Sequence, residues 1–172
     1  KVYRLRFSTQ DFGDYRVPAT SFNYNNFNLP LYDNQLKNTA GNERNLTAMV
    51  GLKKNWGYST LTVSNFHQTA GFFVGAIGIP RSYQLTPDGD SRNIDLPKQV
   101  INHFKVISNS NILIGKNWLE LDMGYQNNYR QEQSNPHAHG KGPRPDGTQA
   151  HALRLQTYSL NARYFIRLSD RH

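Results

Sequence analysis

WLELDMGYQN, the stretch from Trp118 to Asn127, decides the fold because apolar and polar residues alternate along most of it. Positions 119, 121, 123 and 125 hold Leu, Leu, Met and Tyr, whereas positions 120, 122, 124 and 126 hold Glu, Asp, Gly and Gln. Successive side chains of a β-strand point to opposite faces of the sheet. The stretch therefore predicts a strand with one apolar and one polar face.

Other segments have a similar character, with alternating or Thr-, Val- and Tyr-rich sequence. These segments are Tyr3–Ser8, Asn45–Lys53, Gly57–His67, Val100–Ile114 and Leu153–Ile166. The parity breaks once in the second segment, at Met49, and the third and fourth segments alternate less cleanly. The sequence thus predicts about six strands, most of them near or above the roughly 9–11 residues with which a tilted strand crosses a bilayer.

The connections between these strands alternate between short and long. Lys53–Gly57 and Gly115–Asn117 are tight turns, whereas Gln10–Glu43, Gln68–Gln99 and Gln131–Ala150 are long, polar and rich in Gly, Pro and Asn. We expect the long connections to be loops without regular structure. In a compact soluble domain three such loops would count against the strands, but an outer-membrane barrel has short periplasmic turns and long extracellular loops.

The composition agrees with polar β-structure. Only 37% of the residues are hydrophobic and the mean hydropathy is −0.73, yet the chain has 10 Tyr, 9 Phe and 2 Trp. No run approaches the roughly 20 apolar residues of a spanning helix, so any membrane role must come from strands. The absence of Cys excludes disulfides, thiolate metal sites and Cys nucleophiles.

The net charge of +8 has three interpretations. A solvated basic surface, or a barrel wall that meets anionic lipopolysaccharide, comes first. Attraction of an anionic ligand comes second, and nucleic acid, which we do not predict as a partner, comes third. The sequence begins at Lys1 without the pattern of a signal peptide, and we expect it to be an interior piece of a longer protein.

Several segments, in their order along the chain, resemble the barrel region of TonB-dependent outer-membrane receptors of the kind found in Bacteroidetes. The segments are NTAGNERNLTAMVGL (Asn38–Leu52), NWGYSTLTVSNFHQTAGFF (Asn55–Phe73), PKQVINH (Pro97–His103) and LELDMGYQNNYRQE (Leu119–Glu132). The likeness covers roughly Asn38 to Phe165.

This resemblance implies an all-β fold, an antiparallel transmembrane β-barrel segment that supplies about six strands of a larger barrel of about 22. Residues 1–172 would be a single segment of the barrel domain, without counterparts of the plug domain, the TonB box or the closing C-terminal strand. The receptor would import a ferric siderophore or haem across the bacterial outer membrane. Its partners would be that ligand, outer-membrane lipid and lipopolysaccharide, and the TonB complex acting through the missing plug.

On this interpretation Trp56 and Trp118, which both fall beside short turns, would belong to an interfacial aromatic girdle. We predict no cofactor, no enzymatic activity and no catalytic residue.

The third long connection contains the candidate ligand residues His137, His139, Lys141 and Arg144. Two imidazoles in a His-x-His pattern can meet a metal or a haem iron, and the cations can meet the carboxylates of haem or of a ferric chelate. No Asp, Glu or Cys at ligand spacing completes a closed site, so we predict no metal site. The alternative is a solvated polar loop.

Four more candidates lie at strand ends that would face the extracellular mouth, namely His67, Gln68, Tyr129 and Arg130. The alternative for them is ordinary polarity at the end of a strand. His103 lies in the strand that leaves the second long connection, and its pattern leaves open whether it faces the lumen or the lipid.

Two competing hypotheses remain. The first is a soluble β-sandwich, such as a carbohydrate-binding module whose exposed aromatic residues stack on sugars. The second is a β-rich hydrolase that uses Glu120 and Asp122, which share one face of a strand. In a barrel wall that face is the lumen, where polar residues are expected without any chemistry.

Overall fold

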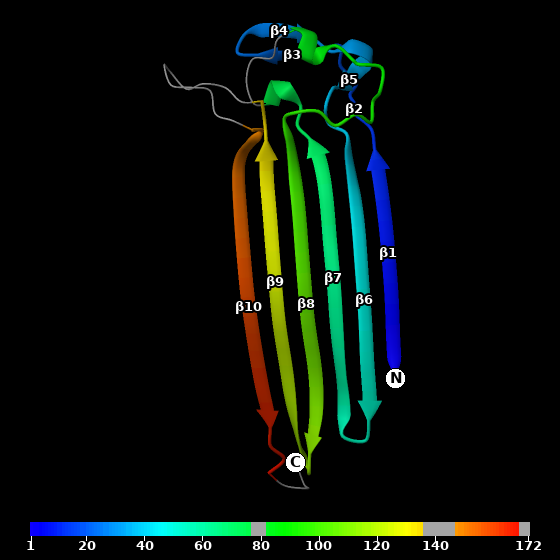
Figure 1. Ribbon diagram of the computed structural model, residues 1–172, viewed down its shortest axis with the longest axis vertical. Coiled ribbons are helices and arrows are strands. Elements are labelled where there is room, and N and C mark those ends of the chain that lie inside the picture. Colours follow the sequence, from blue (N-terminus) through cyan, green and yellow to red (C-terminus); the bar gives the residue numbers. More distant parts are fainter. Residues whose placement is uncertain (77–81, 136–146, 169–172) are drawn as a thin grey trace.

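The computed structural model describes residues 1–76, 82–135 and 147–168, and its main feature is one six-stranded antiparallel sheet (Figure 1). The strand order is β1-β6-β7-β8-β9-β10, so each long strand pairs with the next one along the chain. The strands are β1 (Val2–Phe12), β6 (Gly41–Lys54), β7 (Gly57–Gly71), β8 (Lys98–Ile114), β9 (Asn117–Gln133) and β10 (Gln149–Phe165).

The prediction of an all-β fold with long antiparallel strands is confirmed, since the six predicted segments lie in these strands except for Ile166, which follows the end of β10. Most strands continue further toward the long connections than the alternation indicated. β9, for example, runs on through 128–133, where both faces are polar. β1 and β10 each pair on one side only, so the described strands form an open sheet and not a closed barrel.

Short and long connections lie at opposite ends of the sheet, as Figure 1 shows. At one end Asn55–Trp56 joins β6 to β7, and Gly115–Lys116 joins β8 to β9. The second turn places Gly115 at a φ of 63°, in the left-handed region that glycine adopts readily. At the other end lie the strand ends that the long connections 13–40, 72–97 and 134–148 join. We refer to the described residues of the first two as the loop cap.

The expectation that the long connections lack regular structure is wrong for the loop cap. The first connection contains β2 (Tyr15–Arg16), β3 (Ser21–Tyr24), β4 (Phe27–Pro30), the 3-10 helix η1 (Tyr32–Asn34) and β5 (Gln35–Leu36). The second contains the 3-10 helix η2 (Val74–Ala76) and the short helix α1 (Ser82–Leu85). β3 and β4 form a hairpin because Asn25 and Asn26, with φ of 47° and 69°, make the two-residue left-handed turn that such hairpins require. The described part of the chain has no helix with the length and hydropathy of a membrane-spanning helix.

One buried amide ties the loop cap together. The Asn38 side chain is only 4% exposed, and its Nδ2 donates to the carbonyl oxygens of Phe72 (3.0 Å) and Pro97 (2.9 Å). Its Oδ1 accepts from the backbone N–H of Asp95 at 2.8 Å. A residue of the first connection therefore satisfies backbone groups at both ends of the second.

Further contacts join the same two connections. Asp14 Oδ1 accepts from the N–H groups of Thr39 (2.7 Å) and Ala40 (3.0 Å), while the Asp14 N–H donates to Ser91 O at 2.7 Å. The Phe22 and Phe73 rings meet edge to face at 5.1 Å. The buried hydrophobic side chains of the described residues all lie in the loop cap, and they are Leu31, Ala40, Val74 and Leu85.

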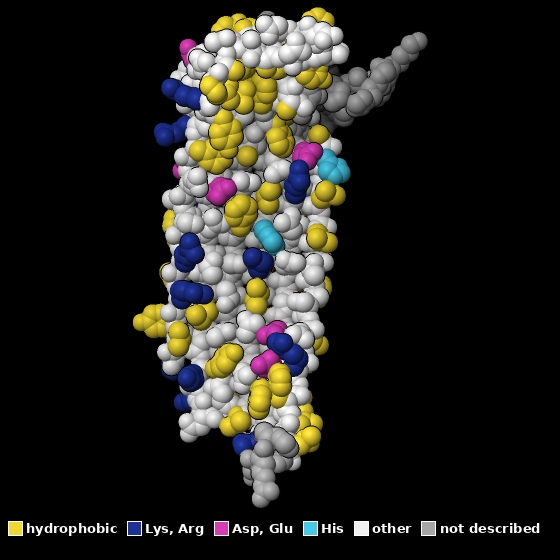
Figure 2. All heavy atoms as spheres, turned by 180° about the vertical axis from the view of Figure 1, so that it is seen from behind, with side chains coloured by type: hydrophobic (Ala, Val, Ile, Leu, Met, Phe, Trp, Pro, Cys, Tyr) yellow, Lys and Arg dark blue, Asp and Glu magenta, His cyan; other side chains and the backbone are white. Residues whose placement is uncertain are grey.

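The strand registers divide the sheet into an apolar face and a polar face. On the apolar face lie Tyr3, Leu5, Phe7, Leu46, Ala48, Val50, Leu61, Val63, Phe104, Val106, Leu119, Leu121, Met123, Tyr125, Tyr158, Leu160, Ala162 and Tyr164. Figure 2 shows the polar face, over which charged side chains are spread. The described residues contain no second large sheet, so they provide no second layer for the β-sandwich hypothesis.

We predict that Asn38→Asp loosens the loop cap without unfolding the long sheet. The substitution removes both Nδ2 donors and places a carboxylate against two carbonyl oxygens, which costs roughly 1–3 kcal/mol. Limited proteolysis and amide exchange at Phe72 and Asp95 should report the loosening.

Asn34→Asp is the matched control, because Asn34 also has a left-handed φ of 55° but its side chain makes one exposed hydrogen bond, to Ala19 O. Equal protection of the second connection in both variants would contradict the role assigned to Asn38.

Candidate functional site

The structure brings the four strand-end candidates to the loop end of the sheet but not into one cluster. His67 and Gln68 lie near the end of β7, and Tyr129 and Arg130 lie near the end of β9. Because neighbours in a strand point to opposite sides, His67 and Tyr129 share the face of the apolar residues. Gln68 and Arg130 lie on the polar face.

His67 and Tyr129 belong to one row of polar residues that crosses the sheet above the apolar side chains. His67 is in register with Asn102, which is in register with Tyr129. The guanidinium carbon of Arg154 lies 4.6 Å from the centre of the Tyr129 ring, and the Tyr129 hydroxyl accepts from Gln131 Nε2 at 3.0 Å. Such a cation–π contact stabilises an exposed pair by about 0.5–1 kcal/mol. The Tyr129 side chain is therefore engaged by its own neighbours.

Gln68 and Arg130 have carboxylate partners on the polar face. Gln68 Nε2 donates to Glu43 Oε1 at 2.6 Å, and an Arg130 nitrogen donates to Glu132 Oε1 at 2.7 Å. The Arg130 and Glu132 side chains are both exposed, and Arg130 retains donors that this ion pair does not use. The pair can thus present hydrogen-bond donors to a ligand at the loop end.

The candidates His137, His139, Lys141 and Arg144 lie outside the described residues. Within the described ranges, no group of three or more His, Cys, Asp or Glu side chains is placed to hold a metal ion. His103, whose face the pattern left open, lies on the polar face, with its Nε2 at 3.2 Å from Gln126 Oε1.

Glu120 and Asp122 lie side by side on the polar face, near the turn between β8 and β9, and a cation bridges them. An Arg163 nitrogen is 3.1 Å from Glu120 Oε2 and 3.7 Å from Asp122 Oδ2. Asn109 Nδ2 also donates to Asp122 Oδ1 at 2.8 Å. Each carboxylate therefore has a partner within the sheet, on β8 or β10.

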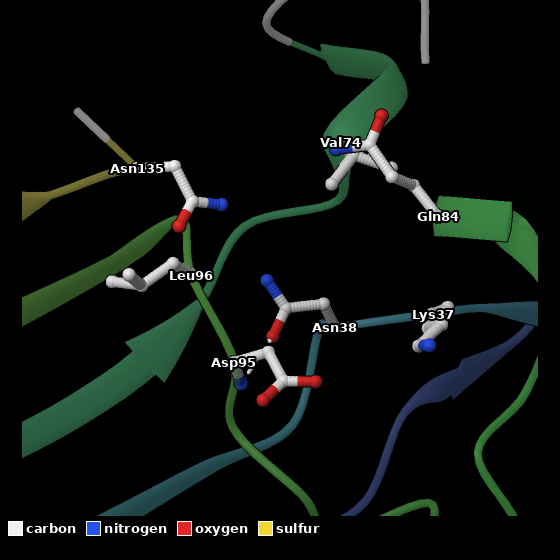
Figure 3. Close-up of a pocket in the computed structure, with 7 residues that line it drawn as sticks. All are labelled: Lys37, Asn38, Val74, Gln84, Asp95, Leu96 and Asn135. Carbon is white, nitrogen blue, oxygen red and sulfur yellow. Dashed lines mark hydrogen bonds between the residues drawn. The ribbon is translucent and has the colours of Figure 1, made fainter. Parts of the chain in front are cut away.

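A hollow of about 340 Å³ at the loop end was not foreseen from the sequence (Figure 3). It is lined by Lys37, Asn38, Val74, Gln84, Asp95, Leu96 and Asn135. Lys37 Nζ donates to Thr86 O at 2.8 Å, which holds its side chain across the loop cap. The volume is in the range of small-molecule sites, and the amide, ammonium and carboxylate groups suit a polar ligand. The sequence of any one connection does not predict this hollow, because its lining residues come from three separate connections.

A second hollow in the loop cap, of about 210 Å³, is acidic, and Asp14, Asp33, Asp88 and Asp90 contribute to its lining. A hydrogen bond from Asn93 Nδ2 to Asp88, followed by one from the Asp90 N–H, lowers the pKa of Asp88 below its usual value. These bonds order the turn at 88–93.

Comparison with known proteins gave no matching family model, no similar curated protein and no similar solved structure. Assignment of a function therefore rests on the residues, on the geometry of the sheet and on the motif resemblance described above.

Proposed function

We propose that this chain is part of the wall of a TonB-dependent outer-membrane receptor. The observation that carries the proposal is an apolar face that no described element covers. Tyr3, Leu5, Tyr158 and Leu160 on that face are 86%, 74%, 76% and 72% exposed. Large exposed apolar patches indicate contact with another apolar phase or partner, and on a barrel wall that phase is lipid.

The position of the apolar residues supports a lipid belt. On β9 they extend from Leu119 to Tyr125, and on β10 from Tyr158 to Tyr164, always toward the short turns. From Leu119 to Tyr125 the strand spans about 20 Å at roughly 3.4 Å per residue, somewhat less than the roughly 25 Å height of an outer-membrane apolar band. Above this level the same face is polar, with Arg44, His67 and Arg154.

Aromatic residues mark the lower end of the belt. Trp56 lies in one short turn, and Trp118 lies next to the other and stacks on Phe165 at 4.9 Å. Rings at this level suit the interface between hydrocarbon and water. Trp118 and Phe165 both have the parity of the polar face, so this pair lies on the lumen side, and Trp56 alone of the two tryptophans remains a candidate for the expected girdle.

The lengths and edges of the strands also fit a larger barrel. β8, β9 and β10 have 17 residues each, which is about 54 Å at 3.4 Å per residue and well beyond the roughly 30 Å of a bilayer core. The loop cap would stand clear of the membrane on the outer side. Among the strands that the structure describes, β1 and β10 each have an unpaired edge, and a barrel needs neighbours there.

The ligand and the energy source follow from the motif resemblance. A ferric siderophore or haem would bind at the loop end, where Gln68, Arg130 and the hollow beside Lys37 offer polar groups. Passage would be driven by the TonB complex pulling on a plug that belongs to another part of the receptor. The chain itself would bind and guide the ligand without a covalent step.

We expect the full-length native protein to be extracted from outer-membrane fractions only with detergent, and to migrate differently on a gel before and after boiling. A closed barrel keeps every strand paired and resists unfolding in cold detergent. A freely soluble protein whose gel mobility does not change on boiling would contradict the proposal. Glycan binding, which the alternative carbohydrate-binding hypothesis predicts, would then be tested.

Two alanines of β10 offer a matched test of the belt. The chain has no Cys of its own, so a Cys introduced at either position would be its single thiol. Ala152 and Ala162 have the same parity, but only Ala162 lies at the level of the apolar residues. In outer-membrane vesicles a charged maleimide should modify Ala152→Cys and leave Ala162→Cys unmodified, since the reagent does not enter hydrocarbon. Both should react after denaturation. Equal modification of both positions in the vesicles would argue against a lipid-facing belt.

The two-faced placement of the strand-end candidates predicts unequal effects on ligand binding. Arg130→Ala and Gln68→Ala should weaken binding of the transported chelate by about tenfold or more, as loss of a hydrogen bond to a charged group does. His67→Ala and Tyr129→Phe, on the opposite face, should change it less than about twofold. Titration of purified receptor with ferric chelates and haem would measure this, and a larger effect from His67→Ala would reverse the assignment of the faces.

A further inference from the structure

A third hollow, which is also polar, lies in the middle of the polar face, far from the loop cap. Its volume is about 350 Å³, and its lining includes Arg6 of β1, Thr47 of β6, Ser64 of β7, and His103 and Lys105 of β8. In Figure 2, Lys and Arg side chains over β1 lie across the sheet from another cation and a His side chain.

The registers explain why the sheet is hollowed there. Arg6 is in register with Thr47, Thr47 with Ser64, and Ser64 with Lys105, so one row crosses four strands. With neighbouring strands about 4.8 Å apart, the two cationic residues are anchored about 14 Å apart. Two short hydroxyl side chains make the floor between them. The row therefore has a long basic side chain at each end and two short hydroxyl side chains, which can form hydrogen bonds, between them.

The cations of this hollow have no anionic partner among the described residues. Elsewhere on the polar face Arg130 pairs with Glu132, and Arg163 pairs with Glu120 and Asp122. Glu43 accepts from Gln68. The carboxylates of the described strands on this face are thus engaged with other groups, and none lies within ion-pair distance of Arg6 or Lys105.

This arrangement is unfavourable when the hollow holds only water. Lys105 is only partly exposed, and Arg4, two residues before Arg6 on the same face, adds a third unpaired cation. Like charges that share one face of a sheet repel, and a partly buried ammonium loses hydration. A bound anion would remove both penalties.

We propose that this hollow binds a small anion that carries two or more carboxylates. Arg6 would hold one carboxylate through its planar donors, and Lys105 would hold another on the far side. The Thr47 and Ser64 hydroxyls and the His103 ring supply further hydrogen bonds. A compact singly charged anion cannot reach both walls at once, so the distance between the cations selects for several charges on one molecule. The site is distinct from the loop end and does not depend on the receptor proposal.

The test is calorimetric titration of the full-length protein, purified in a neutral detergent at low ionic strength, with citrate and with acetate as probes. Citrate should bind at least about tenfold more tightly than acetate. Arg6→Gln and Lys105→Gln should each weaken citrate binding by about tenfold or more, and Lys105→Arg should retain most of it. Raised salt should weaken the binding, because the contacts are ionic.

Lys53→Gln is the matched control. Lys53 has the parity of the polar face, but it lies beside the turn between β6 and β7, outside the hollow. This variant loses the same unit of charge and should bind citrate as the unchanged protein does.

Three results would overturn the proposal: no citrate binding, equal affinity for citrate and acetate, or equal weakening by Lys53→Gln and Lys105→Gln. An unchanged circular dichroism spectrum, checked for each variant, separates loss of the site from loss of the fold. Citrate binding by a protein that failed the barrel test would leave this site standing and the receptor proposal rejected.

Discussion

Antiparallel pairing of the six long strands, in the order β1-β6-β7-β8-β9-β10, is the constraint on which the rest of the structure depends. The five pairings run in register over the length of the strands, with one shift, between Gln149 and His151. Because side chains alternate with a period of two, a slip of one residue in any pair would exchange the two faces of that strand. The apolar belt and the basic hollow both need every register to be correct, since each draws side chains from several strands.

The loop cap is held by a different kind of interaction. Its apolar core is small. Much of its stability comes from the hydrogen bonds that Asn38 donates to backbone carbonyls and that the Asp14 carboxylate accepts from backbone N–H groups. Such bonds are directional, and an unsatisfied buried group is expensive, so they specify one arrangement of the two connections. Long polar segments can be ordered in this way without burying much apolar surface.

Most of the sheet could be predicted from the sequence, because a strand with two different faces leaves a clear period. The pattern in Trp118–Asn127 is local, and so is the signal for the turns. The last residues of β9, 131–133, were assigned to the long connection because both faces are polar there, and pairing with β8 and β10, which is not local, keeps the strand extended. The sequence also left open which face of the sheet His103 occupies, because the pairing of β8 with its neighbours, which fixes that face, is not local.

The candidate site was less predictable. That His67 and Gln68 point to opposite faces follows from the period of a strand, although the sequence analysis grouped them as candidates at one mouth. The hollow beside Lys105 could not be predicted in this way. Arg6 and Lys105 are separated by 98 residues in the sequence, and only three successive strand registers bring them into one row. The hairpin at Asn25–Asn26 did leave a signal, since consecutive Asn residues favour a left-handed turn.

The interlocked loop cap also limits how this protein can be re-engineered. Described residues of 13–40 and 72–97 share the Asn38 amide and the Asp14–Ser91 contact, so each segment supplies hydrogen-bond partners to the other. A chimera that takes one of these segments from a donor protein would leave buried carbonyls without donors in the recipient. The two segments therefore form one transplantable unit, and diversity at this end of the sheet has to be introduced into both at once.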